Sequence, residues 1–166
     1  MSTILEEARL RTTSAALRME PTDMVQLLQS VIDDFKDQAP GVVCTALDPL
    51  TIEVDREKMR MMLRNLIDNA VKNTPQGGKP VVVSMTRGKN HLHIVVEDRG
   101  VGIAESALPH VFDPFFRTDS SRSRKTGGFG LGLSLCKAVV DAHKCKIDIS
   151  SRFGQGTKVV VMLPIS

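Results

Sequence analysis

The sequence REKMRMMLRNLIDNAVKN, residues 56–73, has the apolar spacing of one long amphipathic helix. Its apolar residues form a single stripe when side chains are placed every ~100° around the axis. The stripe consists of Met59, Met62, Leu63, Leu66, Ile67 and Ala70. Thr74-Pro75-Gln76-Gly77-Gly78 then ends the pattern. Two valine-rich runs follow at 81–87 and 91–97, and the turn 88–90 between them predicts a hairpin.

Further elements are predicted on both sides of this helix and hairpin. Asp23 and Gln26 form a candidate capping box for a helix that begins after Pro21 and ends before Ala39-Pro40-Gly41. A third helix is predicted over about 131–143, and strands are predicted at 42–47, 51–55, 146–150 and 157–163. The pattern indicates an α/β fold, a two-layer sandwich in which a mixed sheet of about five strands packs on about three helices.

The composition is that of an ordinary folded domain. The 166 residues include 22 Lys and Arg against 19 Asp and Glu, a net charge of +3, with 42% hydrophobic and 25% charged residues. These values exclude a disordered chain, a collagen or a disulfide mini-protein, and the charge is too small to indicate nucleic acid. No apolar run approaches the ~18 residues that cross a bilayer. The three cysteines form no CxxC pair, which is typical of reduced thiols in a cytosol-like compartment. We therefore expect one soluble domain.

Three polar residues lie along one edge of the apolar stripe in the 56–73 helix: Asn65, Asn69 and Lys72. An asparagine side-chain oxygen is a hard, neutral ligand suited to Mg²⁺, and a lysine one turn further on can meet a phosphate as a point charge. The alternative is that all three are ordinary boundary residues, with Lys72 paired to Asp68 at i,i+4. The helix by itself leaves both interpretations open.

Asp98-Arg99-Gly100-Val101-Gly102 directly follows the second valine-rich strand. A carboxylate at a strand end can accept a hydrogen bond from an exocyclic amine such as that of adenine, and glycines let a flat ring approach the backbone. The same pattern is also a common turn. The segment alone does not decide between a turn and a binding site.

A glycine-rich segment at residues 127–133, GGFGLGL, opens the third predicted helix. Free N–H groups and the positive end of the helix dipole favour phosphate at such a place. The spacing is neither that of a dinucleotide fold nor that of a P-loop. A serine-rich stretch before it carries Arg117, Arg122, Arg124 and Lys125. That composition suits a mobile lid that closes on anions, although a solvated basic loop would have it too.

In this order, the motifs resemble the ATP-binding catalytic domain of two-component sensor histidine kinases, within the superfamily of gyrase, Hsp90, histidine kinases and MutL. Residues 65–72 match the N box, 98–102 the first glycine box, and 112–117, FDPFFR, the F box. Gly128, Gly130 and Gly132 match the second glycine box, and 154–157, GQGT, the last. The likeness covers about 21–164 and implies a Bergerat-type ATP-binding fold.

The resemblance also implies roles for the matched residues. Asn69 would ligate the Mg²⁺ on ATP with help from Asn65, and Asp98 would recognise adenine. Lys72, Arg117 and the second glycine box would contact the phosphates, while Thr157 would lie near the adenine pocket. The whole set expected at ATP and Mg²⁺ is Asn65, Asn69, Lys72, Asp98, Gly100, Gly102, Phe112, Arg117, Gly128, Gly130, Leu131, Gly132 and Thr157.

Two positions depart from the family pattern. Asn73 stands where an aromatic residue or a histidine usually follows the N-box lysine, which bears on stacking against the nucleotide. Lys144-Cys145 stands where a glycine pair usually follows the third helix, which bears on the turn there.

The sequence favours a protein histidine kinase over an ATP-hydrolysing machine. ATPases of the superfamily place a glutamate four residues before the magnesium asparagine, where its carboxylate can deprotonate water. Here that residue is Asn65, which cannot accept a proton at neutral pH. The expected reaction is transfer of the γ-phosphoryl group of Mg-ATP to a histidine. A catalytically silent nucleotide-binding or docking module is the alternative.

We expect the phosphoacceptor histidine to lie outside this chain, on an upstream dimerisation domain, where an acidic residue usually follows it. None of His91, His93, His110 and His143 has that context. Residues 1–20 are interpreted as the remnant of an upstream helix and linker, and 21–166 as the ATP-binding domain. The partners implied are the histidine-bearing domain and a response regulator receiver domain. The chain itself is expected to be a cytoplasmic monomer without membrane contact, and the parent kinase a homodimer.

Overall fold

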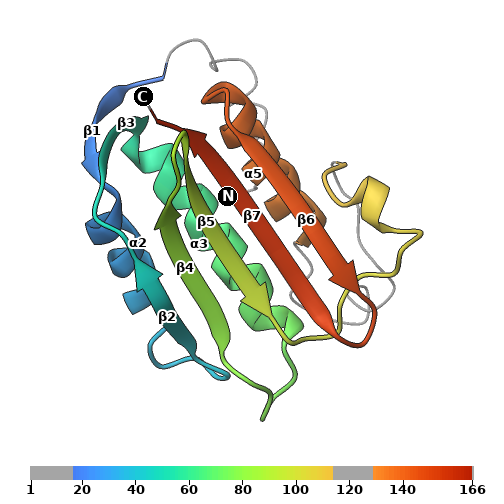
Figure 1. Cartoon of the computed structure of the whole chain (residues 1–166). Coiled ribbons are helices and arrows are strands. Elements are labelled where there is room, and N and C mark those ends of the chain that lie inside the picture. Colours follow the sequence, from blue (N-terminus) through green and yellow to red (C-terminus); the bar gives the residue numbers. More distant parts are fainter. Residues whose placement is uncertain (1–16, 114–128, 166) are drawn as a thin grey trace.

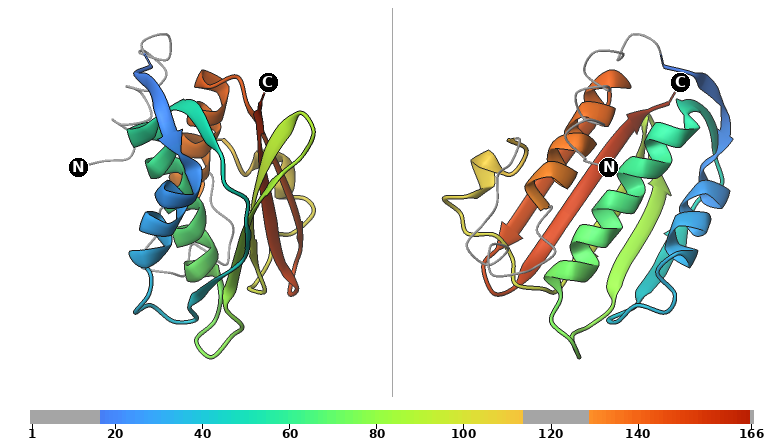
Figure 2. Two further views of the ribbon diagram at one scale, coloured as in Figure 1. Left: turned by 60° about the vertical axis from the view of Figure 1, so that its left-hand side comes forward. Right: turned by 180° about the vertical axis from the view of Figure 1, so that it is seen from behind.

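Helices cover one face of a five-stranded sheet in the computed structural model of the chain, which describes residues 17–113 and 129–165 (Figure 1). The helices in these ranges are α2 (Met24–Asp33), α3 (Arg56–Asn73) and α5 (Phe129–Ala142), with a 3-10 turn, η2 (Leu108–His110). The side view in Figure 2 shows the helices together on one side of the sheet. The predicted two-layer α/β sandwich is therefore confirmed.

The main sheet has the order β2-β4-β5-β7-β6. Its strands are β2 (Val42–Leu47), β4 (Val81–Arg87), β5 (His91–Asp98), β6 (Lys146–Arg152) and β7 (Gly156–Pro164). β2 pairs with β4 in parallel, and the other pairs are antiparallel, including the predicted β4–β5 hairpin. Because side chains alternate along a strand, Asp98 lies on the same face of β5 as the buried Leu92, Ile94 and Val96. That face is the one covered by helices.

A second, two-stranded sheet pairs β1 (Met19–Asp23) with β3 (Thr51–Asp55). β3 was predicted as a strand, but β1 was not, because MEPTD contains a proline and no apolar alternation. β1 forms because the edge of β3 supplies its backbone partners, and only Thr22 in it is buried. The folded unit thus begins at least two residues before position 21.

Side-chain caps start α2 and α3, and the cap of α2 is the Asp23 that the sequence predicted. The Asp23 carboxylate accepts a hydrogen bond from the Gln26 amide at 3.1 Å, and the Asp55 carboxylate accepts one from the Lys58 amide at 3.1 Å. The apolar stripe expected on α3 is buried along its whole length. α5 begins at Phe129, two residues earlier than predicted, so Gly130 and Gly132 lie inside its first turn. No helix in the described ranges is long and apolar enough to span a bilayer.

Candidate functional site

Asp98 ends β5 with a carboxylate that is only 5% exposed. Its Oδ1 accepts a hydrogen bond from the Gly100 amide at 2.8 Å. Burial raises the pKa of Asp98 to about 6, although hydrogen bonds from the backbone of Gly100 and Thr157 act against the rise and the charge of Glu97 adds to it. Within the described ranges no lysine, arginine or histidine forms an ion pair with Asp98. Asp98 is therefore a buried hydrogen-bond acceptor at the end of the sheet that no cation of residues 17–113 or 129–165 compensates.

Two hydroxyl groups extend the site across the sheet from Asp98. Thr157 lies directly opposite Asp98 on β7, and Ser151 lies opposite Thr157 on β6. The Ser151 hydroxyl donates to the Gly156 carbonyl at 2.8 Å and accepts from the Ile103 amide at 2.7 Å. Since Ser151 has one hydroxyl hydrogen, the 2.8 Å contact between the two Oγ atoms has Thr157 as its donor. The sequence interpretation missed Ser151 because it ended the strand at residue 150, two residues before the observed end of β6.

Three glycines next to Asp98 are required by the protein's own backbone. A Cβ at Gly100 would lie 2.1 Å from the Asn73 carbonyl oxygen, and one at Gly156 would lie 2.1 Å from the Asp98 carbonyl oxygen. Gly102, at φ +72°, packs equally closely on the Arg152 carbonyl. The expected reason for the glycines of the first box was the approach of a flat ring to the backbone. Their observed role is to let chain segments contact each other.

The end of α3 holds the loop after Asp98 in place. The Val101 amide donates to the Asn73 carbonyl at 3.0 Å, and the Val101 carbonyl accepts from the Gly154 amide at 2.6 Å. Asn69 lies one turn before Asn73, so its side chain belongs to the part of α3 that contacts this loop. The site thus joins α3, the end of β5 and the β6–β7 hairpin.

Asn69 has a buried side-chain amide that could bind a ligand. Its amide nitrogen is buried and has no hydrogen-bond partner among the residues that the structure describes. An unpaired buried amide costs about 1–3 kcal/mol. A phosphate oxygen would satisfy the N–H group, and a half-turn of the amide would present its oxygen to Mg²⁺ instead. Asn65, one turn earlier on the same face, is half-buried.

Lys72 forms the ion pair that was the alternative interpretation of this helix. Its Nζ lies 3.0 Å from an Asp68 carboxylate oxygen, and the two side chains are 38% and 31% exposed. Partly exposed i,i+4 pairs contribute about 0.3–0.5 kcal/mol, so Lys72 can exchange Asp68 for a phosphate at little cost. Arg60 and Arg64 both pair with Asp34, the residue directly after α2.

The structure describes only some of the remaining predicted site residues. Gly130, Leu131 and Gly132 lie in the first turn of α5, and Phe112 is half-buried against the hydrophobic core. Arg117, Gly128 and the predicted lid with its further cations lie outside the described residues. The Asp55 amide, at the start of α3, donates to His143, just beyond the end of α5. The two helices are therefore antiparallel, and the first turn of α5 lies toward the same end of the molecule as Asn69 and Asp98.

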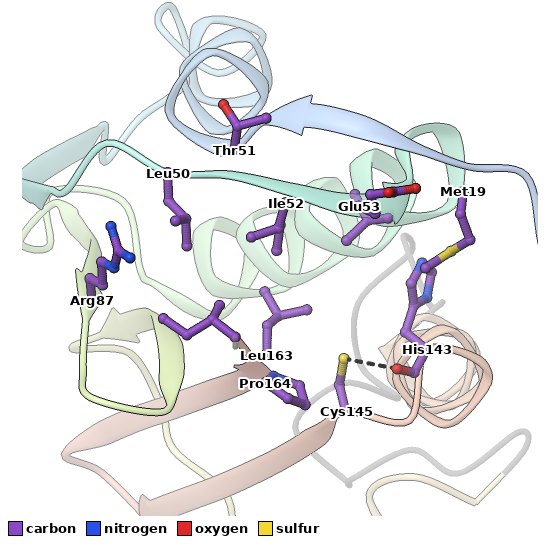
Figure 3. A pocket seen from close by; sticks show the side chains of 12 residues that line it. Met19, Leu50, Thr51, Ile52, Glu53, Arg87, His143, Cys145, Leu163 and Pro164 are labelled. Carbon is purple, nitrogen blue, oxygen red and sulfur yellow. Dashed lines mark hydrogen bonds between the residues drawn. The ribbon is translucent and has the colours of Figure 1, made fainter.

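A pocket of about 560 Å³ lies away from this site (Figure 3). It is lined by residues of β3, the end of β7 and the segment after α5, and it includes none of the predicted site residues. A smaller pocket of about 340 Å³ includes Asp98 and Thr157 in its lining. The larger pocket therefore lies apart from the buried carboxylate of Asp98, and the smaller one includes it.

A family model described as "Histidine kinase-, DNA gyrase B-, and HSP90-like ATPase" matches residues 54–166, more than half of the chain. The chain belongs to this family, and its fold is that of the ATP-binding catalytic domain of a histidine kinase.

Individual relatives agree with this assignment. The chain is 37% identical over 138 residues to the sensor histidine kinase YkoH of Bacillus subtilis, covering 83% of this chain and 29% of YkoH. It is 33% identical to the sensor histidine kinase WalK of the same organism, covering 97% of this chain and 27% of WalK. The crystal structure of full-length ShkA in complex with AMPPNP superposes with a TM-score of 0.82 at 27% identity, over 98% of this chain and 34% of ShkA. The chain thus spans about a third or less of each.

Proposed function

We propose that this chain binds Mg-ATP at the Asp98 end of the sheet and transfers the γ-phosphoryl group to a histidine on a separate dimerisation domain. The observation that carries the proposal is the Asp98 carboxylate, which is buried and has no cation partner within the described ranges. Perturbed acids of this kind concentrate at functional sites. YkoH and WalK are sensor histidine kinases, and ShkA was crystallised with the ATP analogue AMPPNP.

The residues of the site fit this ligand. Asp98 would accept a hydrogen bond from the exocyclic amine of adenine, with the Thr157 hydroxyl beside it. Asn69, whose amide has no partner in the described part of the chain, would hold Mg²⁺ with help from Asn65. Lys72 would leave Asp68 for a phosphate. Mg²⁺, when bound, would neutralise charge on the phosphates.

The same residues favour transfer to a protein over hydrolysis. Phosphoryl transfer needs positioning and charge neutralisation more than covalent help, and asparagine and lysine supply those. Asn65 occupies the place where a glutamate would activate water, and a neutral amide cannot accept that proton. The proposed partners are a histidine-bearing dimerisation domain and a response regulator receiver domain, and the proposed location is the cytoplasm.

Titration calorimetry with ATP and GTP tests the nucleotide assignment. ATP should bind and GTP should bind poorly, because the guanine carbonyl would face the Asp98 carboxylate. Replacing Asp98 with Ala removes a charge-assisted hydrogen bond of about 1.5–3 kcal/mol, so ATP affinity should fall roughly tenfold to hundredfold. Equal affinity of the unaltered chain for ATP and GTP would refute the assignment of Asp98.

A labelling experiment tests transfer separately. With γ-labelled ATP and Mg²⁺, the chain alone should remain unlabelled, since His91 and His93 lie on β5 and His143 is hydrogen-bonded at the opposite end from Asp98. Adding a histidine-bearing dimerisation domain of the same kinase in trans, at high concentration to replace a tether, should label that domain. Nucleotide binding without any labelling of the added domain would favour the silent docking module instead. Acid-labile phosphate on a histidine of the isolated chain would contradict the proposed separation of domains.

A further inference from the structure

His143, directly after α5, uses both ring nitrogens in hydrogen bonds. Nδ1 lies 2.9 Å from the Val139 carbonyl oxygen, and Nε2 lies 3.0 Å from the Asp55 amide nitrogen. A carbonyl can only accept and an amide N–H can only donate, so Nδ1 carries the hydrogen and Nε2 is the acceptor. The two bonds therefore fix one neutral tautomer of the ring.

Asp55, whose amide bonds to His143, also contacts α3 and the residue before β1 through its side chain. Its carboxylate accepts from the Lys58 amide at 3.1 Å, which caps α3, and from the Arg18 amide at 3.0 Å, just before β1. The residue is 4% exposed. Burial acts to raise the pKa of Asp55, but these hydrogen bonds and the Lys58 ammonium hold that pKa below its usual value. The start of α3 and the residue before β1 thus meet at the Asp55 carboxylate, and the end of α5 meets the backbone amide of the same residue.

We propose that His143 is a positioning residue for the nucleotide site, acting through the His143–Asp55 contact. This inference rests on the proposed function. α3 and α5 are antiparallel neighbours, and the contact joins them at the end opposite Asn69 and the first turn of α5. α3 is about 27 Å long, so a small change of angle at the contact displaces the far end measurably. Midway along the two helices, the Cys136 thiol of α5 makes only a weak contact with the Met62 carbonyl of α3, at 3.6 Å.

The competing explanation is that His143 only fills space. Its ring forms part of the wall of the 560 Å³ pocket, beside Met19 of β1, and the Cys145 thiol contacts the His143 carbonyl (Figure 3). Loss of the ring would then change stability without reaching Asn69. Three substitutions separate the explanations. Glutamine can place its amide oxygen near the position of Nε2, where an acceptor is needed, and asparagine can place its amide NH₂ near that of Nδ1, where a donor is needed. Leucine fills space with neither group.

Amide NMR of the nucleotide-free chain tests the proposal, because chemical shifts near Asn69 should not change if His143 only fills space. The reporters are the Asn69 side-chain amide and the Val101 amide, which is bonded to the Asn73 carbonyl at the end of α3. His143→Leu should shift both signals, and His143→Gln should leave both near their original positions. In calorimetry, ATP dissociation constants should rise between about twofold and thirtyfold for the leucine variant, the range of coupling through packed networks, and less than twofold for the glutamine variant.

Each outcome bears on the proposal. If His143→Leu fails to fold, His143→Asn takes its place and should behave as a loss, because it keeps only the bond toward Val139. Unchanged Asn69 and Val101 signals in a folded leucine or asparagine variant would overturn the proposal. So would a glutamine variant as impaired as the leucine one. If the unaltered chain does not bind ATP, the proposed function fails, and the NMR shifts still decide the positioning role.

Discussion

Replacement of Asp98 by Asn should make the protein more stable and a weaker binder of ATP. Asparagine has nearly the same shape and keeps an oxygen for the Gly100 amide, but it carries no charge to bury. The wild-type carboxylate has its pKa raised from 3.8 to about 6, chiefly by burial. At about 1.36 kcal/mol per pH unit, that difference corresponds to roughly 3 kcal/mol of burial cost.

The sign of the pH dependence follows from protonation. Below pH 3.8 the Asp98 carboxyl is protonated in the folded and the unfolded chain, so it imposes no cost. Between pH 3.8 and about 6 the unfolded chain ionises first, and stability falls as the pH rises; above about 6 the whole cost is present. Allowing about 1 kcal/mol for a lost backbone hydrogen bond, the variant should gain about 2 kcal/mol at pH 8 and lose about 0.5 kcal/mol near pH 4, where little of the burial cost remains.

Two assays check this prediction. Thermal unfolding at pH 8 should show a midpoint about 4–8 °C higher for Asp98→Asn, at about 2–4 °C per kcal/mol for a chain of this size. In calorimetry the wild-type dissociation constant for ATP should rise about twofold at pH 6 and about elevenfold at pH 5, relative to pH 8. The variant provides the control for titration of ATP itself. A variant that is less stable at pH 8, or that has the same pH dependence of ATP binding, would refute the reasoning.

Three further substitutions have matched controls or a clear direction. Lys144 has φ +57° at the end of α5, where it closes a Schellman-type turn that favours glycine, so Lys144→Gly should stabilise the chain by about 0.5–1 kcal/mol in chemical denaturation. Asn69→Ala should abolish the magnesium-dependent part of ATP binding. Asp68→Ala should leave ATP binding intact, or tighten it by releasing Lys72. Equal losses of affinity in calorimetry would contradict the assignment of Asn69 to Mg²⁺. Gly102→Ala should cost about 3 kcal/mol or more, because φ is +72° and a carbonyl oxygen lies 2.1 Å from the new Cβ. Gly154→Ala, at φ +83° in open space, should cost about 1–2 kcal/mol. Similar unfolding free energies for the two variants would argue against the close approach at Gly102.

Local periodicity was sufficient to predict most of the fold. The stripe from Met59 to Ala70 and the valine-rich pair of strands each contain the information for their own structure, because apolar spacing sets both the element and its buried face. β1 could not be predicted, since MEPTD becomes a strand only when β3 lies beside it. For the same reason β3, although predicted as a strand, could not be assigned to a separate sheet.

The candidate site was predictable in its residues and less so in their interactions. Ordered motifs pointed to Asn69 and Asp98 as candidates, but the unpaired amide of Asn69 follows from tertiary packing. The contact of Gly100 with the Asn73 carbonyl joins two segments that are separated in the sequence. The His143–Asp55 contact spans 88 residues, and nothing in the spacing of either residue indicates it.

The most direct test of the central claim is to locate the metal of bound metal-ATP by NMR, with Mn²⁺ in place of Mg²⁺. Paramagnetic broadening weakens steeply with distance, and α3 alone separates the two ends of the molecule by about 27 Å. Mn-ATP should broaden the Asn69 side-chain amide and the Gly100 amide, and leave His143 and Leu163 at the 560 Å³ pocket sharp. Broadening at His143 and Leu163 with unaffected signals from Asn69 and Gly100 would contradict the account.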